Sequence, residues 1–321
     1  MPSENPRKGT ADRSMPHSFE KHVAGVCGTL LLVAGGCTSD PRGGSTEQNG
    51  TGPGGLHASA LTVQNGFPGP SDTGVPAGAV LTAYDGPMTI TVPGTVIDAR
   101  IIRGTLHVDA PGVTVTRSMI AGNIDLDEPT STLVLEDVEV DGAPTWQPAI
   151  GFNNITMRRV EVEGARVSVL CGSNCTIEDS WLHGQYLEPG TDWHVNGYLS
   201  NGGSNVLLRH NTLVCDAPEN SAEGSCTGPA ASFGDFEPLR NITYERNLFA
   251  AGPGAYCLYA GYNPDKPFGS DPMGIVVTNN IFERGPNGQC ASYGPVASFQ
   301  AGPGNVWAGN RWDDGGEVSP G

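Results

Sequence analysis

The chain has 321 residues, of which 34 are acidic and 17 are Lys or Arg, so its formal net charge is −17. Nucleic acid is an unsuitable partner for such a chain, because phosphate contacts need a basic surface. A strongly polyanionic ligand is disfavoured for the same reason, unless calcium or a local basic patch compensates. The 46 Gly and 26 Pro residues separate short apolar segments, so they indicate turns between folded elements and not a disordered chain.

The N-terminal region is similar to an export signal. An apolar run over Val23–Gly36 is too short to span a bilayer and ends in small residues directly before Cys37. This ending resembles a bacterial lipoprotein signal, which implies that Cys37 is lipidated; the alternative is ordinary cleavage and free release. We predict a signal segment at 1–37, a flexible Gly/Ser-rich linker at 38–65 and one folded domain at 66–321.

A short pattern recurs along the folded domain and predicts a solenoid. In Asn154–Gly164 a small residue or Asn precedes apolar residues at alternate positions, such as Ile155 and Met157, and this period of two is typical of strands. The copies begin near Gly94, Gly112, Thr132, Asn154, Asn174, Asn205, Asn241, Gly274 and Gly304. They lie 18 to 22 residues apart at first and 30 to 36 apart at the end, so the C-terminal half carries long loop insertions. We interpret each copy as two short strands joined at a corner, and stacking of copies as the source of the core.

This all-β pattern resembles the right-handed parallel β-helix of pectate lyases and related carbohydrate-active proteins, over roughly residues 67–315. The resemblance implies a single β-helix domain of about nine coils. It also implies a basic residue that removes a proton beside a uronate carboxyl, and Lys266 and Arg209 are the candidates. A further likeness to secreted actinobacterial β-helix proteins is carried by His183-Gly184-Gln185, Gly234-Asp235-Phe236 and residues 310–315.

Six cysteines follow Cys37, and an even number in an exported chain predicts disulfides. Cys257 lies 16 residues after the start of one copy, and Cys290 lies 16 residues after the start of the next. They therefore occupy the same position in consecutive coils, about 4.8 Å apart, which is within reach of a disulfide. We predict the bridge Cys257–Cys290, which leaves two local bridges, Cys171–Cys175 and Cys215–Cys226.

Two rows of acidic side chains are predicted on one face of the stack. Glu139 and Glu161 share a position in consecutive coils, as do Asp141 and Glu163. Stacked like charges raise the pKa of one member, which suits acid–base catalysis or a calcium site; a merely exposed acidic face is the alternative. Another row alternates in charge and predicts a ladder of ion pairs: Arg117, Asp137, Arg159, Asp179 and His210.

The insertion that follows the coil at Asn174 concentrates candidate site residues beside these acidic rows. We predict His183 or His194 as the acid or base and Asp192 as the residue that orients it. A capping loop, or a His/His/Asp metal site, is the alternative. The candidate catalytic residues are His183, Asp192, His194, Asp141, Glu163 and Lys266. The candidate substrate-binding residues are Trp181, Tyr186, Trp193, Arg209, His210 and Asp235.

The sequence favours an exported monomer, secreted or held at the membrane by a lipid anchor alone, that binds and cleaves an extracellular polysaccharide. The reaction would be that of a lyase or a glycoside hydrolase, with calcium as the one cofactor to consider. The alternative is a non-catalytic cell-surface module that binds glycans. A cleft lined by carboxylates and His under the insertion favours the enzyme, whereas a flat aromatic strip favours the binding module.

Overall fold

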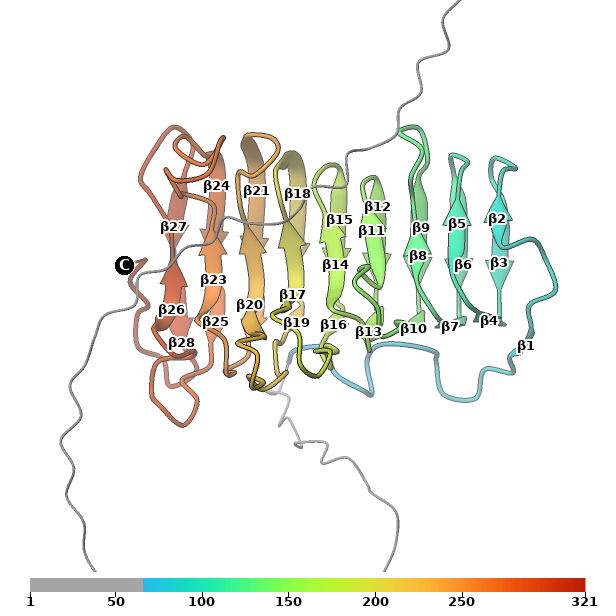
Figure 1. Cartoon of the computed structure of the whole chain (residues 1–321), viewed down its shortest axis with the longest axis horizontal. Helices are drawn as coiled ribbons and strands as arrows, with labels where there is room; N and C mark the ends of the chain where they lie inside the picture. The colour runs from blue at the N-terminus through green and yellow to red at the C-terminus, as the bar shows by residue number, and fades with distance from the viewer. Residues whose placement is uncertain (1–65, 321) are drawn as a thin grey trace, which may run out of the picture. The chain divides into compact units, whose positions relative to one another are not determined.

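The computed structural model describes residues 66–320, and the predicted signal segment, Cys37 and the linker lie outside these residues. The described chain is all-β and forms a parallel β-helix (Figure 1). Three sheets run along the stack, and within each sheet the strands follow one another in sequence order. Within residues 66–320 there is no helix of the length and hydrophobicity needed to cross a membrane.

Each sheet takes every third strand of the chain, and we name the sheets A, B and C. Sheet A contains β1 (Thr82–Ala83), β4 (Arg100–Arg103), β7 (Met119–Ala121), β10 (Glu139–Asp141), β13 (Glu161–Glu163), β16 (Trp181–Leu182), β19 (Thr212–Leu213), β22 (Leu248–Phe249), β25 (Ile281–Phe282) and β28 (Arg311–Trp312). Sheet B contains β2 (Thr89–Ile90), β5 (Leu106–Val108), β8 (Ile124–Asp125), β11 (Ile150–Phe152), β14 (Val167–Cys171), β17 (His194–Ser200), β20 (Ser225–Ser232), β23 (Tyr256–Ala260) and β26 (Gly294–Ala297). Sheet C contains β3 (Val96–Asp98), β6 (Val113–Thr116), β9 (Leu133–Glu136), β12 (Ile155–Arg158), β15 (Cys175–Glu178), β18 (Gly203–Arg209), β21 (Leu239–Glu245), β24 (Met273–Thr278) and β27 (Val306–Ala308).

The nine predicted copies correspond to the nine strands of sheet C, each followed at a corner by a strand of sheet A. The prediction that each copy forms two short strands joined at a corner is confirmed. Every complete coil also contributes a third strand, to sheet B, which the sequence analysis did not predict. That strand falls in the stretch between copies, where the insertions vary in length and hide any common pattern. The inward side chains of all three sheets form one continuous apolar core, with Leu135, Val140 and Ile150 fully buried in one coil.

The corner between sheets C and A is made by one residue with a left-handed backbone, for example Arg159 with φ 53° and His210 with φ 55°. The side chain of such a corner residue points to solvent, so a charged residue is tolerated. Part of the predicted ion-pair ladder is present, because Arg159 Nε lies 2.6 Å from Asp137 Oδ1 and His210 Nδ1 lies 2.7 Å from Asp179 Oδ1. Arg117 instead pairs with Asp98, on the coil before it.

The residue after the corner points inward, and in the last four coils it is an asparagine. Asn211, Asn247, Asn280 and Asn310 are buried and form a ladder along the stack. Each side-chain oxygen accepts a hydrogen bond from the backbone N–H of the preceding coil, as Asn280 Oδ1 does from Asn247 N at 2.8 Å. The ladder therefore satisfies polar groups that the tight corner would leave unpaired in the core.

All three predicted disulfides are present in the described chain: Cys171–Cys175, Cys215–Cys226 and Cys257–Cys290. The last of them joins consecutive coils, with 6.2 Å between the two Cα atoms.

The segment 66–79, which we call the strap, runs along the outer side of sheet A before the first coil begins (Figure 1, blue). Thr212 Oγ1 donates a hydrogen bond of 2.6 Å to Pro68 O, and Gly74 N donates one of 3.0 Å to Arg159 O. The strap was not predicted from the sequence. Because it covers part of sheet A, the strap limits the area of this sheet that a ligand can contact.

Candidate functional site

The predicted acidic rows exist on the outer side of sheet A. Glu139 pairs in register with Glu161, and Asp141 pairs with Glu163. Burial raises the pKa of Glu139, and the neighbouring carboxylate of Glu161 raises it further. Burial also raises the pKa of Glu163, although His183 opposes this effect. The predicted rise in the pKa of one member of each stacked carboxylate pair therefore has a structural cause.

The predicted base, however, is enclosed within this face. His183 is buried, its Nε2 lies 3.0 Å from Glu161 Oε1, and its ring stacks on the buried indole of Trp181 at 3.5 Å between ring centroids. The strap passes close by, because a Cβ placed on Gly74 would lie 3.1 Å from Glu161 Oε2. The arrangement stabilises the stack and leaves His183 little room to reach a polymeric substrate.

The insertion lies apart from His183. Asp192 and the His194 side chain are exposed, and no hydrogen bond or ion pair joins either of them to His183 among the described residues. Trp193 packs edge-on against Trp146 at 5.5 Å between ring centroids, and Tyr186 is half-buried. The insertion is therefore a packed corner of the molecule and does not form a lid over the acidic rows.

Beneath this corner lies a buried arginine that the sequence analysis did not identify. Arg166 Nε donates to Trp146 O at 2.9 Å, Nη1 donates to His194 O at 2.9 Å, and the guanidinium stacks on Trp146 at 3.9 Å. Burial lowers the pKa of Arg166 to about 10. Backbone carbonyls and an indole ring satisfy this cation, so Arg166 acts as a clamp for the corner.

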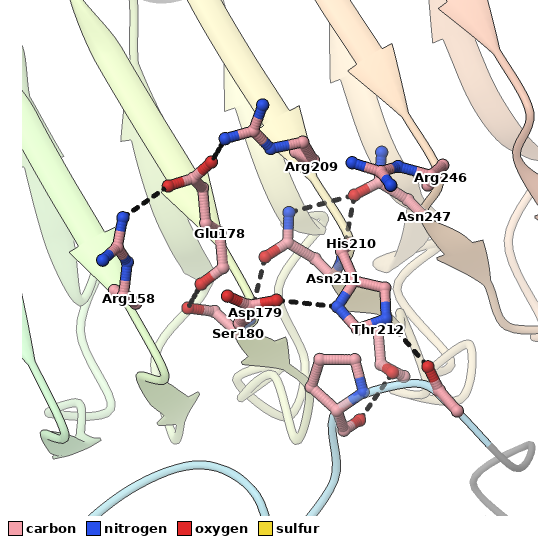
Figure 2. A network of polar contacts seen from close by, with 12 residues as sticks. Arg158, Glu178, Asp179, Ser180, Arg209, His210, Asn211, Thr212, Arg246 and Asn247 are labelled. Atoms are coloured by element: carbon pink, nitrogen blue, oxygen red, sulfur yellow. Dashed lines mark hydrogen bonds and ion pairs between the residues drawn. The ribbon is translucent and has the colours of Figure 1, made fainter.

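The candidate bases and sugar-binding cations elsewhere are engaged in ion pairs. Arg209 and Arg158 both bind Glu178, and the Arg158 Nη2 to Glu178 Oε2 distance is 3.1 Å (Figure 2). Lys266 Nζ lies 2.7 Å from Asp235 Oδ1, so two predicted site residues do meet, but as an ion pair. These side chains are therefore paired with carboxylates and are not free to abstract a proton.

An outward row of sheet B, which the sequence analysis missed, combines polar and apolar side chains in one line. Strand register places its members side by side from coil to coil: His107, Asp125, Gly151, Leu170, Leu199, Ala231, Tyr259 and Ala297. The third strand of each coil supplies this row, and its residues share no chemical type. No repeat signal could therefore have found it.

Around Tyr259, in the C-terminal part of this row, lies an aromatic platform, which we define as Phe233, Tyr256, Tyr259 and Tyr293. Ring centroids lie 5.2 Å apart for Phe233 and Tyr259, 5.4 Å for Tyr256 and Tyr259, and 5.9 Å for Tyr256 and Tyr293. Tyr293 is 73% exposed. Burial raises the pKa of Tyr259 to about 12, so its hydroxyl stays protonated and can donate a hydrogen bond. Phe233 and Tyr259 pack on an apolar cluster that contains Leu170 and the buried residues Leu199 and Ala231.

The other end of the row carries a carboxyl in an unusual environment. Asp125 Oδ1 is buried and has no hydrogen-bond partner in the described structure, while Oδ2 lies 3.8 Å from His107 Nδ1. Burial raises the pKa of Asp125, and Asp127 raises it further. Gly151, the next member of the row, is buried, and a Cβ placed on it would lie 3.0 Å from Pro148 Cγ. A carboxyl of this kind is suited to donate a proton.

The described residues contain no group of three or more His, Cys, Asp or Glu side chains arranged to hold a metal ion. Comparisons of the chain with known protein families, with curated proteins and with solved structures find no match. The site consequently has to be interpreted from its own geometry.

Proposed function

We propose that this protein is an exported glycan-binding β-helix protein whose ligand lies along the outer side of sheet B. The observation that carries the proposal is the aromatic platform, in which four rings lie within 6 Å centroid-to-centroid steps of one another and Tyr293 is 73% exposed. Aromatic rings offer flat apolar faces to the C–H groups of sugars, and the tyrosine hydroxyls add hydrogen bonds at the ring edge.

The residues beneath the platform support a fixed arrangement of its rings. Leu199 and Ala231 are buried and pack with Leu170, Phe233 and Tyr259 in one apolar cluster. Coils repeat at the spacing of hydrogen-bonded strands, about 4.8 Å. A polymer laid along the stack would therefore cross one coil at each step of this length. The three disulfides support export, because such bridges persist in oxidising compartments.

Binding is tested with the purified 66–321 domain and a panel of plant, microbial and cell-wall oligosaccharides. The variants Tyr293→Ala and Tyr256→Ala should weaken binding of the best ligand by about tenfold each, consistent with aromatic contacts worth 0.5–1.5 kcal/mol beyond the buried area. Trp146→Ala is the matched control, since Trp146 is exposed in the loop before β11, four strands along sheet B from β23, which carries Tyr256 and Tyr259. Equal losses in all three variants, or none in the tyrosine variants, would contradict the proposal.

Cleavage of the bound glycan is a second candidate function, and Asp125 is the observation that favours it. Its raised pKa and unpartnered oxygen suit a general acid at the end of the row. Asp125→Asn should then abolish release of reducing ends or of unsaturated products, whereas Asp141→Asn and His183→Ala should retain it. If His183→Ala keeps its fold but loses activity, the catalytic residues would lie on sheet A instead.

A further inference from the structure

A groove of about 600 Å³ opens on sheet A, beyond the part that the strap covers. Two basic side chains, Arg246 and Arg311, line it, and the rings of Phe67 and Trp312 also face it. Phe67 belongs to the strap and Trp312 to the last coil, so segments from opposite ends of the described chain form this groove. Its volume lies within the range typical of small-ligand sites.

The two guanidinium groups of the groove differ from most arginines of this protein. Elsewhere, Arg117, Arg159 and Arg209 each pair with a carboxylate on a neighbouring coil. Among the described residues Arg311 has no carboxylate at ion-pair distance, and Arg246 has only a long contact of 3.6 Å with its chain neighbour Glu245. Both side chains therefore keep most of their hydrogen-bonding groups for another partner.

Both acidic side chains that line the groove are bonded to Arg284. Arg284 Nε lies 2.6 Å from Asp314 Oδ2, and that hydrogen bond lowers the pKa of Asp314. Asp313 Oδ1 accepts a hydrogen bond from Arg284 N at 3.2 Å. His210 lies 2.7 Å from Asp179 Oδ1 through Nδ1 and 2.8 Å from Gly66 O through Nε2, so both ring nitrogens are engaged within the protein (Figure 2).

We infer that this groove is a second binding site and that it takes an anionic sugar carrying a carboxylate or a sulfate. Guanidinium groups bind both oxyanions through paired N–H donors. The rings of Phe67, which stacks on His210, and Trp312, which has Arg284 over one face, flank them with apolar surface for the sugar. In a chain with a net charge of −17, such a local basic patch is what an acidic glycan requires. The choice of a sugar as the ligand rests on the proposed function, but this groove lies on sheet A, whereas the aromatic platform lies on sheet B.

The test measures binding of a uronate tetrasaccharide, a sulfated tetrasaccharide and a neutral tetrasaccharide by calorimetry, at two salt concentrations. At least one acidic probe should bind more tightly than the neutral probe, and the one that does identifies the oxyanion. The double variant Arg246→Gln/Arg311→Gln should lower that affinity by at least about tenfold, because charged hydrogen bonds are lost. Arg103→Gln is the control, since Arg103 is exposed at the other end of sheet A and forms no ion pair within the described chain.

The inference would be overturned if the double variant kept the affinity of the unaltered protein, or if the neutral probe bound as tightly as the acidic probes. It would also be overturned if neither acidic probe bound, or if inorganic sulfate bound and no sugar did. The two proposals can fail separately. If binding is lost in Tyr293→Ala but normal in the arginine variants, the proposal for the platform is supported and the inference about the groove is rejected. Thermal unfolding of each variant identifies any that loses its fold.

Discussion

The asparagine ladder supports a quantitative prediction for Asn247→Ala. Asn247 is fully buried, and its Oδ1 accepts hydrogen bonds from Asn211 N and Nδ2, both at 3.0 Å. Its Nδ2 donates to Leu208 O at 2.9 Å and to Asn280 Oδ1 at 3.1 Å. The side chain thus joins three consecutive coils at the corner between sheets C and A.

The magnitude follows from the groups that the substitution leaves unpaired. Alanine removes the partners of the Asn211 N–H, of one Asn211 amide hydrogen and of the Leu208 carbonyl. Each unpaired buried polar group lowers the free energy of unfolding by about 1–3 kcal/mol. Water that enters the space left by the side chain can bond to these three groups, so each loss lies at the lower end of this range. We therefore expect a loss of about 3–5 kcal/mol in the free energy of unfolding, or roughly 6–20 °C in Tm for a domain of this size.

The matched control is Asn241→Gly. Asn241 also belongs to a row of asparagines, but it is exposed, and its Nδ2 makes one hydrogen bond of 3.3 Å with Asn205 Oδ1. Its φ of 55° suits glycine, so the loss should stay below about 1 kcal/mol. Urea and thermal unfolding followed by circular dichroism compare the two variants. Similar losses in both would refute the assignment of stability to the inner ladder.

Three further predictions concern stability. Replacing both Cys257 and Cys290 by Ser opens a loop of 33 residues and should cost about 3–4 kcal/mol, measured by urea unfolding; an unchanged midpoint would contradict this. Because the fold raises the pKa of Glu139, its charged form opposes folding: Glu139→Gln should raise Tm at pH 7, and the gain should disappear as the pH falls below the ordinary value of 4.5. A gain that persists at pH 3 would have another cause. His183→Ala should lower Tm, because it leaves Glu161 without its hydrogen bond and Trp181 without its stacking partner; an unchanged Tm would show that this contact is weak.

The fold could be predicted from the sequence because the coils share a physical requirement. Every coil needs inward apolar residues at alternate positions and a corner residue that tolerates a left-handed backbone, so residues such as Ile155, Met157 and Arg159 recur in register. The same register predicted the bridge Cys257–Cys290 and the stacking of Glu139 on Glu161. These features depend only on position within a coil.

The candidate site could not be predicted in the same way. The platform residues Phe233, Tyr256 and Tyr293 lie in stretches of unequal length between copies, where no repeat aligns them. Their proximity depends on how insertions fold back, as does the strap over sheet A, which begins before the first copy. Sequence register therefore identified the charged rows, but not which of them the strap covers.

Hydroxyl-radical footprinting tests the central claim most directly. The side-chain oxidation of the domain would be measured with and without the oligosaccharide that binds best. We predict that bound glycan protects Tyr256, Tyr259 and Tyr293 and leaves the oxidation of Trp146 unchanged. Protection of the strap and of the His183 region, with the three tyrosines as reactive as before, would show that the ligand lies on sheet A and would contradict the proposed function.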